Sequence, residues 1–340
     1  MKFILFSDIH FHKHNAFATY IDGVHSRVFY TFLVLEQILD YARDNQIKDI
    51  FFAGDMYHTK SYIDTSVIDP VYAFFLKYRD EFNFYFISGN HDFADKGKHS
   101  LLTPFKALGK LAEGPEVYTL GTTRVGMIPY RFNKLSLLQE VSEMNVDVLI
   151  LHEGISGAKV EGREIEEGLN LKELKKTLSS RVKHVFMGHF HDPKCLDDSM
   201  VSFIGAPIHI TFGDIGPRGF QVYDTDAHTH EMVETVFPKF ITLDDAAIKK
   251  YSEEDLKELC TSNYVRFQIT KETALVERIK EVTPVVINLQ AEKRDYEQRL
   301  DIGVSDDLSD IMAKYIAKFN TNFDVDKLLT IGSEIIEESK

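Results

Sequence analysis

The chain has 340 residues, of which 44% are hydrophobic and 27% are charged, a balance typical of a folded protein of about two domains. Its two cysteines exclude a disulfide scaffold and a cysteine-built zinc site, and because the sequence has neither a membrane-spanning apolar run nor a signal peptide, we expect a cytoplasmic protein with no membrane association. The net charge of −14 excludes a protein that grips nucleic acid through a broad basic surface, unless bound cations or a partner supply the positive charge.

Short apolar runs alternate with amphipathic stretches in the first two thirds of the chain, which is typical of an α/β or layered fold. The expected strands are Lys2–Ser7, Asp49–Ala53, Asn83–Ser88, Thr123–Pro129, Asp147–Leu151, Lys183–Met187, Met200–Ile204 and Gly219–Asp224. The expected helices between them are Ser26–Arg43, Ile68–Tyr78, Leu101–Leu108, Lys134–Glu143 and Leu171–Leu178.

The last hundred residues have a different pattern, so we divide the chain into residues 1–240, 241–300 and 301–340. The middle part predicts a small β–α–β unit with helices Glu253–Cys260 and Ala274–Val282 and strands Tyr264–Thr270 and Pro284–Gln290. A polar connection, Ala291–Gly303, precedes two amphipathic helices, Asp306–Phe319 and Val325–Glu337. These helices either pack back onto the main body or extend from it on the polar connection.

Polar side chains follow five of the expected strands, at the point where each strand ends. They are Asp8, His10, Asp55, Asn90, His91, Asp92, His152, His189 and His191. Each could by itself be a turn residue or a surface histidine. Because α/β folds place their sites at the carboxyl ends of strands, the whole set predicts one common site.

Seven of these residues form a mixed set of oxygen and nitrogen ligands: Asp8, His10, Asp55, Asn90, His152, His189 and His191. Imidazole suits transition metals, whereas carboxylate and amide oxygens suit harder ions such as manganese. Seven ligands are too many for one ion that must also hold a substrate, so we expect two ions with Asp55 between them. Two ions bridged in this way supply a nucleophile at neutral pH and clamp a phosphate.

The motifs Asp-x-His, Gly-Asp, Gly-Asn-His-Asp, His and Gly-His-x-His occur here in the order found in the calcineurin-like metallophosphoesterases, which the first 225 or so residues resemble. The resemblance implies a four-layer α-β-β-α sandwich with a small α+β cap domain and C-terminal helices. It also implies that Asp8, His10, Asp55 and His191 hold one metal ion, and that Asp55, Asn90, His152 and His189 hold the other.

Two further roles follow from the same resemblance. His91 is implied to face the phosphate, where it protonates the leaving oxygen or stabilises the developing charge. Asp92 is implied to orient His91 through a hydrogen bond.

Three features resemble the SbcD-like DNA-repair nucleases within this superfamily. His58 completes a Gly-Asp-x-x-His pattern in which the histidine contributes to nuclease action, although an ordinary loop histidine explains it equally well. The segments Phe203–Pro207, Phe212–Asp214 and Pro217–Phe220 resemble a Gly-Ser-Pro, Phe-Gly-Glu, Lys-Gly-Phe stretch, with Ala206, Asp214 and Arg218 as mild departures. The third feature is the tail, whose order of cap unit, connection and helices matches those nucleases.

This second resemblance implies a manganese-dependent DNA exonuclease and single-strand endonuclease. It also implies that residues 1–240 form the nuclease domain, that 241–300 form a DNA-facing cap, and that 301–340 bind an SMC-like coiled-coil ATPase. A homodimer within a heterotetramer is implied, for which Ile68–Tyr78 and Leu101–Leu108 are candidate contacts. The compact chain resembles the bacteriophage version of this recombination and repair subunit. The alternative is a metallophosphatase or small-molecule phosphodiesterase of the same superfamily.

Overall fold

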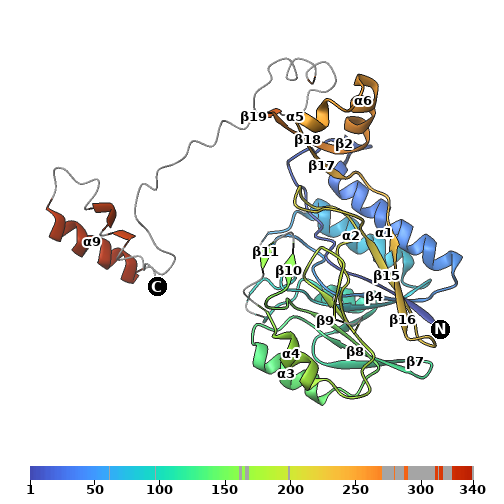
Figure 1. Cartoon of the computed structure of the whole chain (residues 1–340). Coiled ribbons are helices and arrows are strands. Elements are labelled where there is room, and N and C mark those ends of the chain that lie inside the picture. The colour runs from blue at the N-terminus through green and yellow to red at the C-terminus, as the bar shows by residue number, and fades with distance from the viewer. Residues whose placement is uncertain are drawn as a thin grey trace.

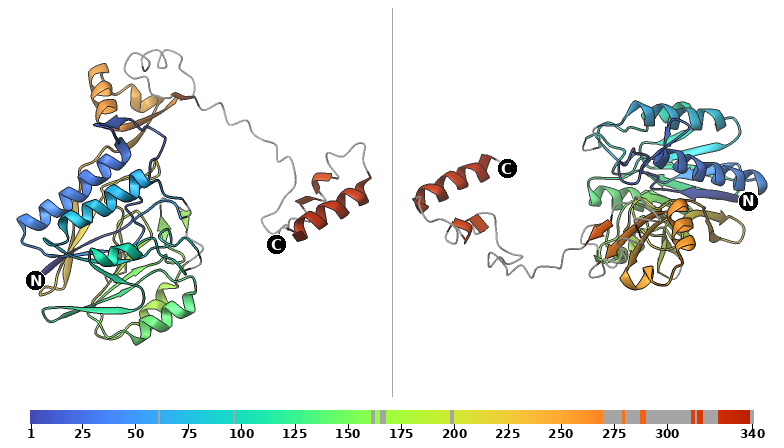
Figure 2. Two further views of the ribbon diagram at one scale, coloured as in Figure 1. Left: turned by 180° about the vertical axis from the view of Figure 1, so that it is seen from behind. Right: turned by 90° about the horizontal axis from the view of Figure 1, so that it is seen from above.

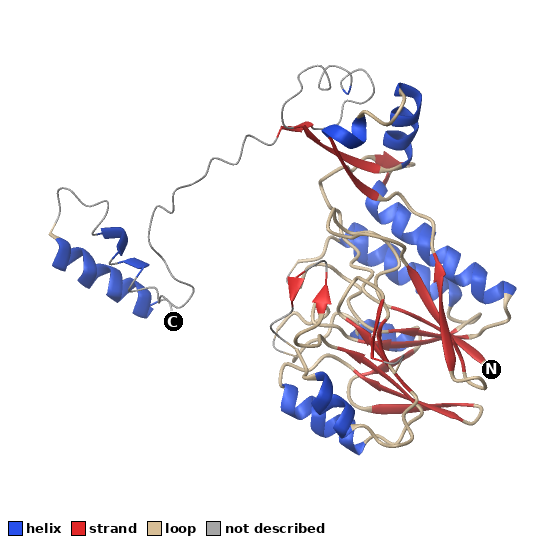
Figure 3. Ribbon diagram, in the orientation of Figure 1, coloured by secondary structure: helices blue, strands red, loops and turns tan. Residues whose placement is uncertain are grey.

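The main body is a sandwich of two sheets with helices on both outer sides (Figure 1, Figure 3). This computed structural model describes residues 1–60, 62–95, 97–160, 163–164, 168–197, 200–269, 279, 287–289, 311–312, 314–316 and 324–338. Within these ranges each of the two sheets has six strands. The expected α-β-β-α architecture is therefore confirmed.

The first sheet has the strand order β16-β15-β1-β4-β5-β6. Its strands are β1 (Lys2–Phe6), β4 (Asp49–Phe52), β5 (Asn83–Ile87), β6 (Lys110–Ala112), β15 (Gly219–Asp224) and β16 (Thr229–Glu234). β1, β4 and β5 run parallel, with Phe6 opposite Phe52 and Phe52 opposite Phe86. The carboxyl ends of these three strands therefore lie side by side at one edge.

The second sheet has the strand order β13-β14-β12-β9-β8-β7. Its strands are β7 (Glu116–Leu120), β8 (Thr123–Ile128), β9 (Val148–His152), β12 (His184–Gly188), β13 (Lys194–Asp197) and β14 (Val201–Phe203). β9 and β12 are parallel and completely buried, and Gly188 pairs with His152. Two more strand ends are thus placed next to each other.

Three hydrophobic clusters separate the four layers. Between the sheets, Phe3, Phe51 and Tyr85 form a row with ring centroids 5.0 and 4.3 Å apart, and Phe186 packs from the other sheet. A second cluster joins the first sheet to its helices, and a third joins the second sheet to its own. Burial on both faces explains why these strands read as continuous apolar runs in the sequence.

Helices α1 (Ser26–Asp44) and α2 (Thr65–Tyr78) and the short 3₁₀ helix η1 (Thr103–Ala107) cover the first sheet, while α3 (Lys134–Glu143) and α4 (Leu171–Thr177) cover the second. Asn133 and Asn170 cap α3 and α4 by accepting backbone N–H bonds. The helix expected at Leu101–Leu108 is present in part, as the shorter 3₁₀ helix η1, and Gly109 follows it.

The cap contains the parallel strands β17 (Phe240–Asp244), β18 (Tyr264–Ile269) and β19 (Ile287–Leu289), with helices α5 (Asp245–Ile248) and α6 (Glu253–Ser262). A capping box of Ser252 and Asp255 begins α6. The strand β17 was missed because its sequence pattern is too short to identify without its partner. The expected helix Ala274–Val282 lies outside the described residues, except for the buried Ile279.

Aromatic rings connect the cap to the main body. Phe212 of the body packs on Phe240 of the cap, with ring centroids 4.8 Å apart, and Phe17 contacts both rings. The Arg27 side chain donates to the Ile210 carbonyl at 2.8 Å while its guanidinium covers Phe240. Two short hairpins lie outside the larger sheets, β2 (Tyr20–Ile21) with β3 (Val24–His25), and β10 (Lys159–Val160) with β11 (Arg163–Glu164).

Helix α9 (Val325–Glu338) stands apart from the sandwich and the cap in two opposite views (Figure 1, Figure 2). Helical residues at 311–312 and 314–316 lie beside it, and Met312 packs against Gly332. The polar connection Ala291–Gly303 lies outside the described residues. Among the helices described, none combines the length and the apolar character needed to cross a membrane.

Candidate metal centre

Five strand ends meet at one edge of the sandwich and carry the residues predicted to bind metal. They are Asp8 and His10 after β1, Asp55 after β4, Asn90 after β5, His152 at the end of β9, and His189 and His191 after β12. Backbone hydrogen bonds join the first two loops, from Asp8 N to Gly54 O at 2.9 Å and from His10 N to Asp55 O at 3.0 Å. These bonds hold the two loops side by side.

Four of these residues have a left-handed backbone, which is uncommon for any residue except glycine. The φ angles are 54° at Asp8, 48° at His10, 63° at Asp55 and 96° at His189. Such strained conformations cost about 1–3 kcal/mol each and persist only where the surroundings hold them. Here the strain turns each side chain out of its strand and toward the common edge.

Glycines allow these loops to approach closely. Gly54 has φ 98°, and a Cβ there would lie 2.6 Å from the backbone nitrogen of Gly89. A Cβ on Gly89 would in turn overlap the Asp55 carboxylate. The Gly-Asp and Gly-Asn-His-Asp motifs therefore require glycine because backbone and carboxylate occupy the space of a side chain.

The side chains fall into two groups whose candidate ligand atoms lie within 4.8 Å of one another. One group is Asp8, His10 and His191, and the other is Asp55, His152 and His189. Asp55 links them, since its Oδ2 atom is 3.5 Å from His10 Nε2 and 3.4 Å from His152 Nε2. Asp55 therefore lies between the two groups.

Asn90 belongs to the second group through its side-chain oxygen. Its Oδ1 atom lies 3.1 Å from His152 Nε2 and 2.9 Å from His189 Nδ1. The amide oxygen and the two ring nitrogens therefore converge on one point. All seven predicted ligands are thus brought together.

The donor set fits divalent ions. Neither ring nitrogen of the buried His10 has a hydrogen-bond partner among the described residues, which is costly unless another group binds there. The Nδ1 atom of His152 donates to the Ala53 carbonyl at 2.6 Å, which leaves its Nε2 atom free to coordinate an ion. Unpaired nitrogens and carboxylate oxygens facing a common centre are what a metal site requires.

Burial and charge compete in this site. Burial alone would raise the pKa of Asp55, but the neighbouring histidines, His152 foremost, together outweigh it and hold the pKa well below its usual range. Burial raises the pKa of Asp8 and lowers that of His10 well below its ordinary value. The lowered pKa values of Asp55 and His10 favour the ionised carboxylate and the neutral imidazole that bind metal ions, whereas the raised pKa of Asp8 favours its protonated form until a cation lies beside it.

His91 is held beside this centre but outside both groups. Its backbone N–H donates to Asp55 Oδ1 at 2.8 Å, and its ring lies 4.9 Å from the ring of His10. The Nδ1 atom of His91 donates to the His58 carbonyl at 2.6 Å. The Nε2 atom is therefore the one left to act on a substrate.

The implied role of Asp92 needs correction. Its carboxylate accepts backbone N–H bonds from Gly89, Asp55, Met56 and Tyr57, at 2.7 to 3.3 Å. Among the described hydrogen bonds, the one that orients the His91 ring comes from the His58 carbonyl instead. The buried backbone N–H groups of these loops need an acceptor, and the Asp92 carboxylate supplies it. The His91 ring already has an acceptor in the His58 carbonyl.

His58 also contributes its side chain to the site. The ring nitrogens of His10, His58 and His91 lie within 4.8 Å of one another, and the rings of His58 and His91 are stacked at 5.8 Å. Burial lowers the pKa of His58 to about 4, so its ring is neutral at pH 7.

Three residues near the centre were given no role by the sequence analysis. His12 and His14 lie beside His58, with ring centroids at 5.3 and 4.9 Å, and the alternation of histidines from His10 to His14 was a usable signal. Asp214 lies behind His191. The Phe-Gly-Asp pattern marked Asp214 in the sequence, but only the structure shows that this residue lies next to His191.

Residues 1–193 match the calcineurin-like phosphoesterase family, and the chain belongs to that family. Among solved structures it is similar to an archaeal phosphodiesterase, with 11% identity, a TM-score of 0.36, and coverage of 69% of this chain and 100% of the other. It is also similar to a dimetal phosphatase from Danio rerio, with 12% identity, a TM-score of 0.43, and coverage of 65% and 91%. No curated protein sequence matches the chain. The family match and the candidate metal ligands identify the chain as a metal-dependent phosphoesterase.

Proposed function

We propose that this phosphoesterase is a manganese-dependent DNA nuclease, acting as an exonuclease and single-strand endonuclease in an SbcCD-like recombination and repair complex of the bacteriophage type. The observation that carries the proposal is the position of His58. The Gly-Asp-x-x-His pattern left open whether His58 is an ordinary loop residue, and its ring stacks on His91 beside the candidate metal ligands. This supports the nuclease interpretation of the pattern.

In the proposed reaction, His91 faces the scissile phosphate and transfers one proton to the leaving oxygen. Two divalent ions, when bound, activate water and offset the charge of the phosphate. His91 keeps its Nε2 atom toward the centre because its Nδ1 atom donates to His58 and its backbone donates to Asp55. A protonated His91 can therefore donate from Nε2 to the leaving 3′ oxygen as the phosphodiester bond breaks.

The proposed ATPase partner and second copy of the chain are suggested by the negative net charge and by the C-terminal helices. With a net charge of −14, the chain needs outside positive charge to hold DNA tightly. An SMC-like ATPase docked on the C-terminal helices would supply it, by a helix-in-groove contact. A second copy of the chain would add a further set of contacts, in a homodimer within a heterotetramer.

The test compares substrates under identical conditions with Mn²⁺. The wild type is incubated with linear double-stranded DNA, single-stranded DNA, a chromogenic phosphomonoester and a bis-phosphodiester. His91→Ala, purified in the same way, is the control for contaminating nucleases. We expect cleavage of both DNAs by the wild type only. Fast hydrolysis of the monoester with intact DNA would instead identify a phosphatase.

A further inference from the structure

A buried ion pair lies directly behind the metal ligand His191. Asp214 and Arg218 are each only 1% exposed, and Asp214 Oδ1 is 3.4 Å from Arg218 Nη2. The same Oδ1 atom is 3.6 Å from the Nδ1 atom of His191. Burying two charges is expensive unless they are paired and held, so this arrangement needs a reason beyond stability alone.

The Asp214 carboxylate is fixed by its own turn. Its Oδ2 atom accepts the backbone N–H groups of Ile210 at 2.8 Å and Thr211 at 2.7 Å. These two bonds use up one oxygen and set the plane of the carboxylate. The other oxygen, Oδ1, is thereby directed at His191 and Arg218.

Arg218 is fixed in turn by the chain on both sides. Its Nη1 atom donates to the carbonyls of Ile215 at 2.9 Å and Pro217 at 3.2 Å, and to Asp192 Oδ1 at 3.3 Å. Asp192 is the residue that follows His191. The guanidinium therefore connects the turn of Asp214 to the loop that carries the metal ligand.

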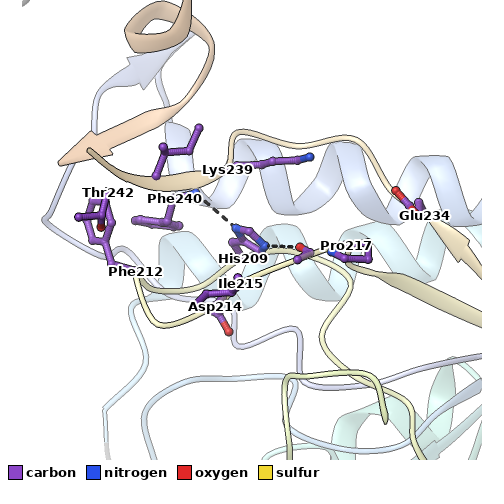
Figure 4. Close-up of a pocket in the computed structure, with 11 residues that line it drawn as sticks. His209, Phe212, Asp214, Ile215, Pro217, Glu234, Lys239, Phe240 and Thr242 are labelled. Carbon is purple, nitrogen blue, oxygen red and sulfur yellow. Dashed lines mark hydrogen bonds between the residues drawn. The ribbon is translucent and has the colours of Figure 1, made fainter. Parts of the chain in front are cut away.

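The turn also lines a cavity of about 630 Å³ at the junction with the cap (Figure 4). There His209 donates from Nε2 to the Gly216 carbonyl at 2.9 Å and accepts the backbone N–H of Phe240 at 3.3 Å. The turn of residues 210–217 is therefore held at both ends. A support that cannot shift is what a ligand needs when its ring must keep one orientation.

We propose that Asp214, fixed by Arg218, is a positioning residue that accepts a hydrogen bond from Nδ1 of His191 and so presents the Nε2 atom of His191 to the metal centre. Metal-ligating histidines commonly donate their second ring N–H to a carboxylate, which fixes the tautomer and the ring orientation. The inference rests on the metal centre and is independent of which phosphoester is cleaved. It also gives a purpose to the Phe212–Asp214 and Pro217–Phe220 motifs.

The competing explanation is that Asp214 only stabilises its own turn. Asp214→Asn separates the two, because the amide oxygen can still accept from Ile210 and Thr211 while its NH₂ group cannot accept from His191. Asp147→Asn is the matched control: Asp147 is also a buried carboxylate paired with an arginine, Arg181, at 2.7 Å, and it precedes β9 at the end opposite His152.

The experiment is a titration of the full-length chain with Mn²⁺, in which electron paramagnetic resonance measures the free ion. We expect Asp214→Asn to weaken one of two Mn²⁺ sites by about 10–100-fold and to leave the other unchanged. Asp147→Asn should bind both ions like the wild type, and Asp214→Glu should recover most of the lost affinity. Unchanged affinity in Asp214→Asn, or equal weakening of both sites, would overturn the proposal.

A second measurement needs no substitution at Asp214, in case Asp214→Asn does not fold. A long-range ¹H–¹⁵N spectrum of the Zn²⁺-loaded wild type reports the tautomer of each histidine, and the His191 signals are assigned by their absence in His191→Gln. We expect His191 to carry its proton on Nδ1. A proton on Nε2 would contradict the assigned role whatever the activity on DNA.

Discussion

His91 is the side chain whose loss should separate metal binding from turnover. Its Nδ1 atom donates to the His58 carbonyl, and its ring belongs neither to the group of Asp8, His10 and His191 nor to the group of Asp55, His152 and His189. We expect His91→Ala to lower the rate of phosphoester cleavage by about 10²–10⁴-fold with little change in Mn²⁺ affinity. Single-turnover kinetics and Mn²⁺ titration of the same preparation measure both effects.

The control for this substitution is His99→Ala, which removes an exposed histidine from the loop that follows His91. It should cleave like the wild type. Full activity of His91→Ala would show that this imidazole takes no part in the reaction.

Asp92 should matter first for stability, because its carboxylate serves four backbone N–H groups in the loops of Gly54 and Gly89. Leaving buried donors unpaired costs about 1–3 kcal/mol for each group. We expect Asp92→Ala to lower the free energy of unfolding, measured by urea denaturation, by at least about 3 kcal/mol. Asp92→Asn, which keeps one acceptor oxygen, should lose less.

A different outcome would restore the role first inferred for Asp92. If Asp92→Ala unfolds at the same urea concentration as the wild type and changes only the pH profile of turnover, then its carboxylate acts through His91 rather than through the backbone.

Helix α2 packs on the first sheet with one face and leaves an apolar residue exposed on the other. Val67, Val71 and Phe75 are buried, whereas Leu76 is 42% exposed. A separate cavity of about 310 Å³ lies between α2 and η1 and is lined by Tyr72 among others. The exposed Leu76 and this cavity support α2 and η1 as the proposed contact between two copies of the chain.

We therefore expect Leu76→Asp to shift the chain from dimer toward monomer in sedimentation velocity, since a buried unpaired charge opposes association. Its matched control is Leu135→Asp, which places the same charge at an exposed leucine on the other outer layer. Equal sedimentation of Leu76→Asp and the wild type would exclude this face as the contact.

At the scale of the whole molecule, the C-terminal helices stand apart from the sandwich (Figure 2). An amphipathic helix such as α9, with Leu328 and Leu329 only half exposed, needs an apolar surface to pack against. We expect a chain truncated after Gly303 to keep its Mn²⁺-dependent cleavage and to lose association with the ATPase in pull-down experiments. Substituting aspartate at Leu328 and Leu329 should have the same effect at full length.

Two results would contradict this prediction. Co-purification of the truncated chain with the ATPase would place the dock elsewhere. Aggregation of the truncated chain would show that the helices belong to the folded body.

The sequence by itself determined the alternation of strands and helices and the candidate ligands, because both depend on local patterns, whereas the four-layer sandwich was implied by the family resemblance of the motifs. A strand buried on both faces must be apolar, and a polar residue at its carboxyl end or just beyond it, such as His152 or Asp55, must lie at the sheet edge.

Only the tertiary structure decided which partners these residues have. The hydrogen bonds of Asp92 run to the loop after Gly54, more than thirty positions away, and the ring of His91 is oriented by a carbonyl rather than by a side chain. Asp214 meets His191 across 23 positions of sequence, through a turn that no periodicity predicts. Such contacts join residues that are distant along the chain, so their geometry exists only once the sheets have packed.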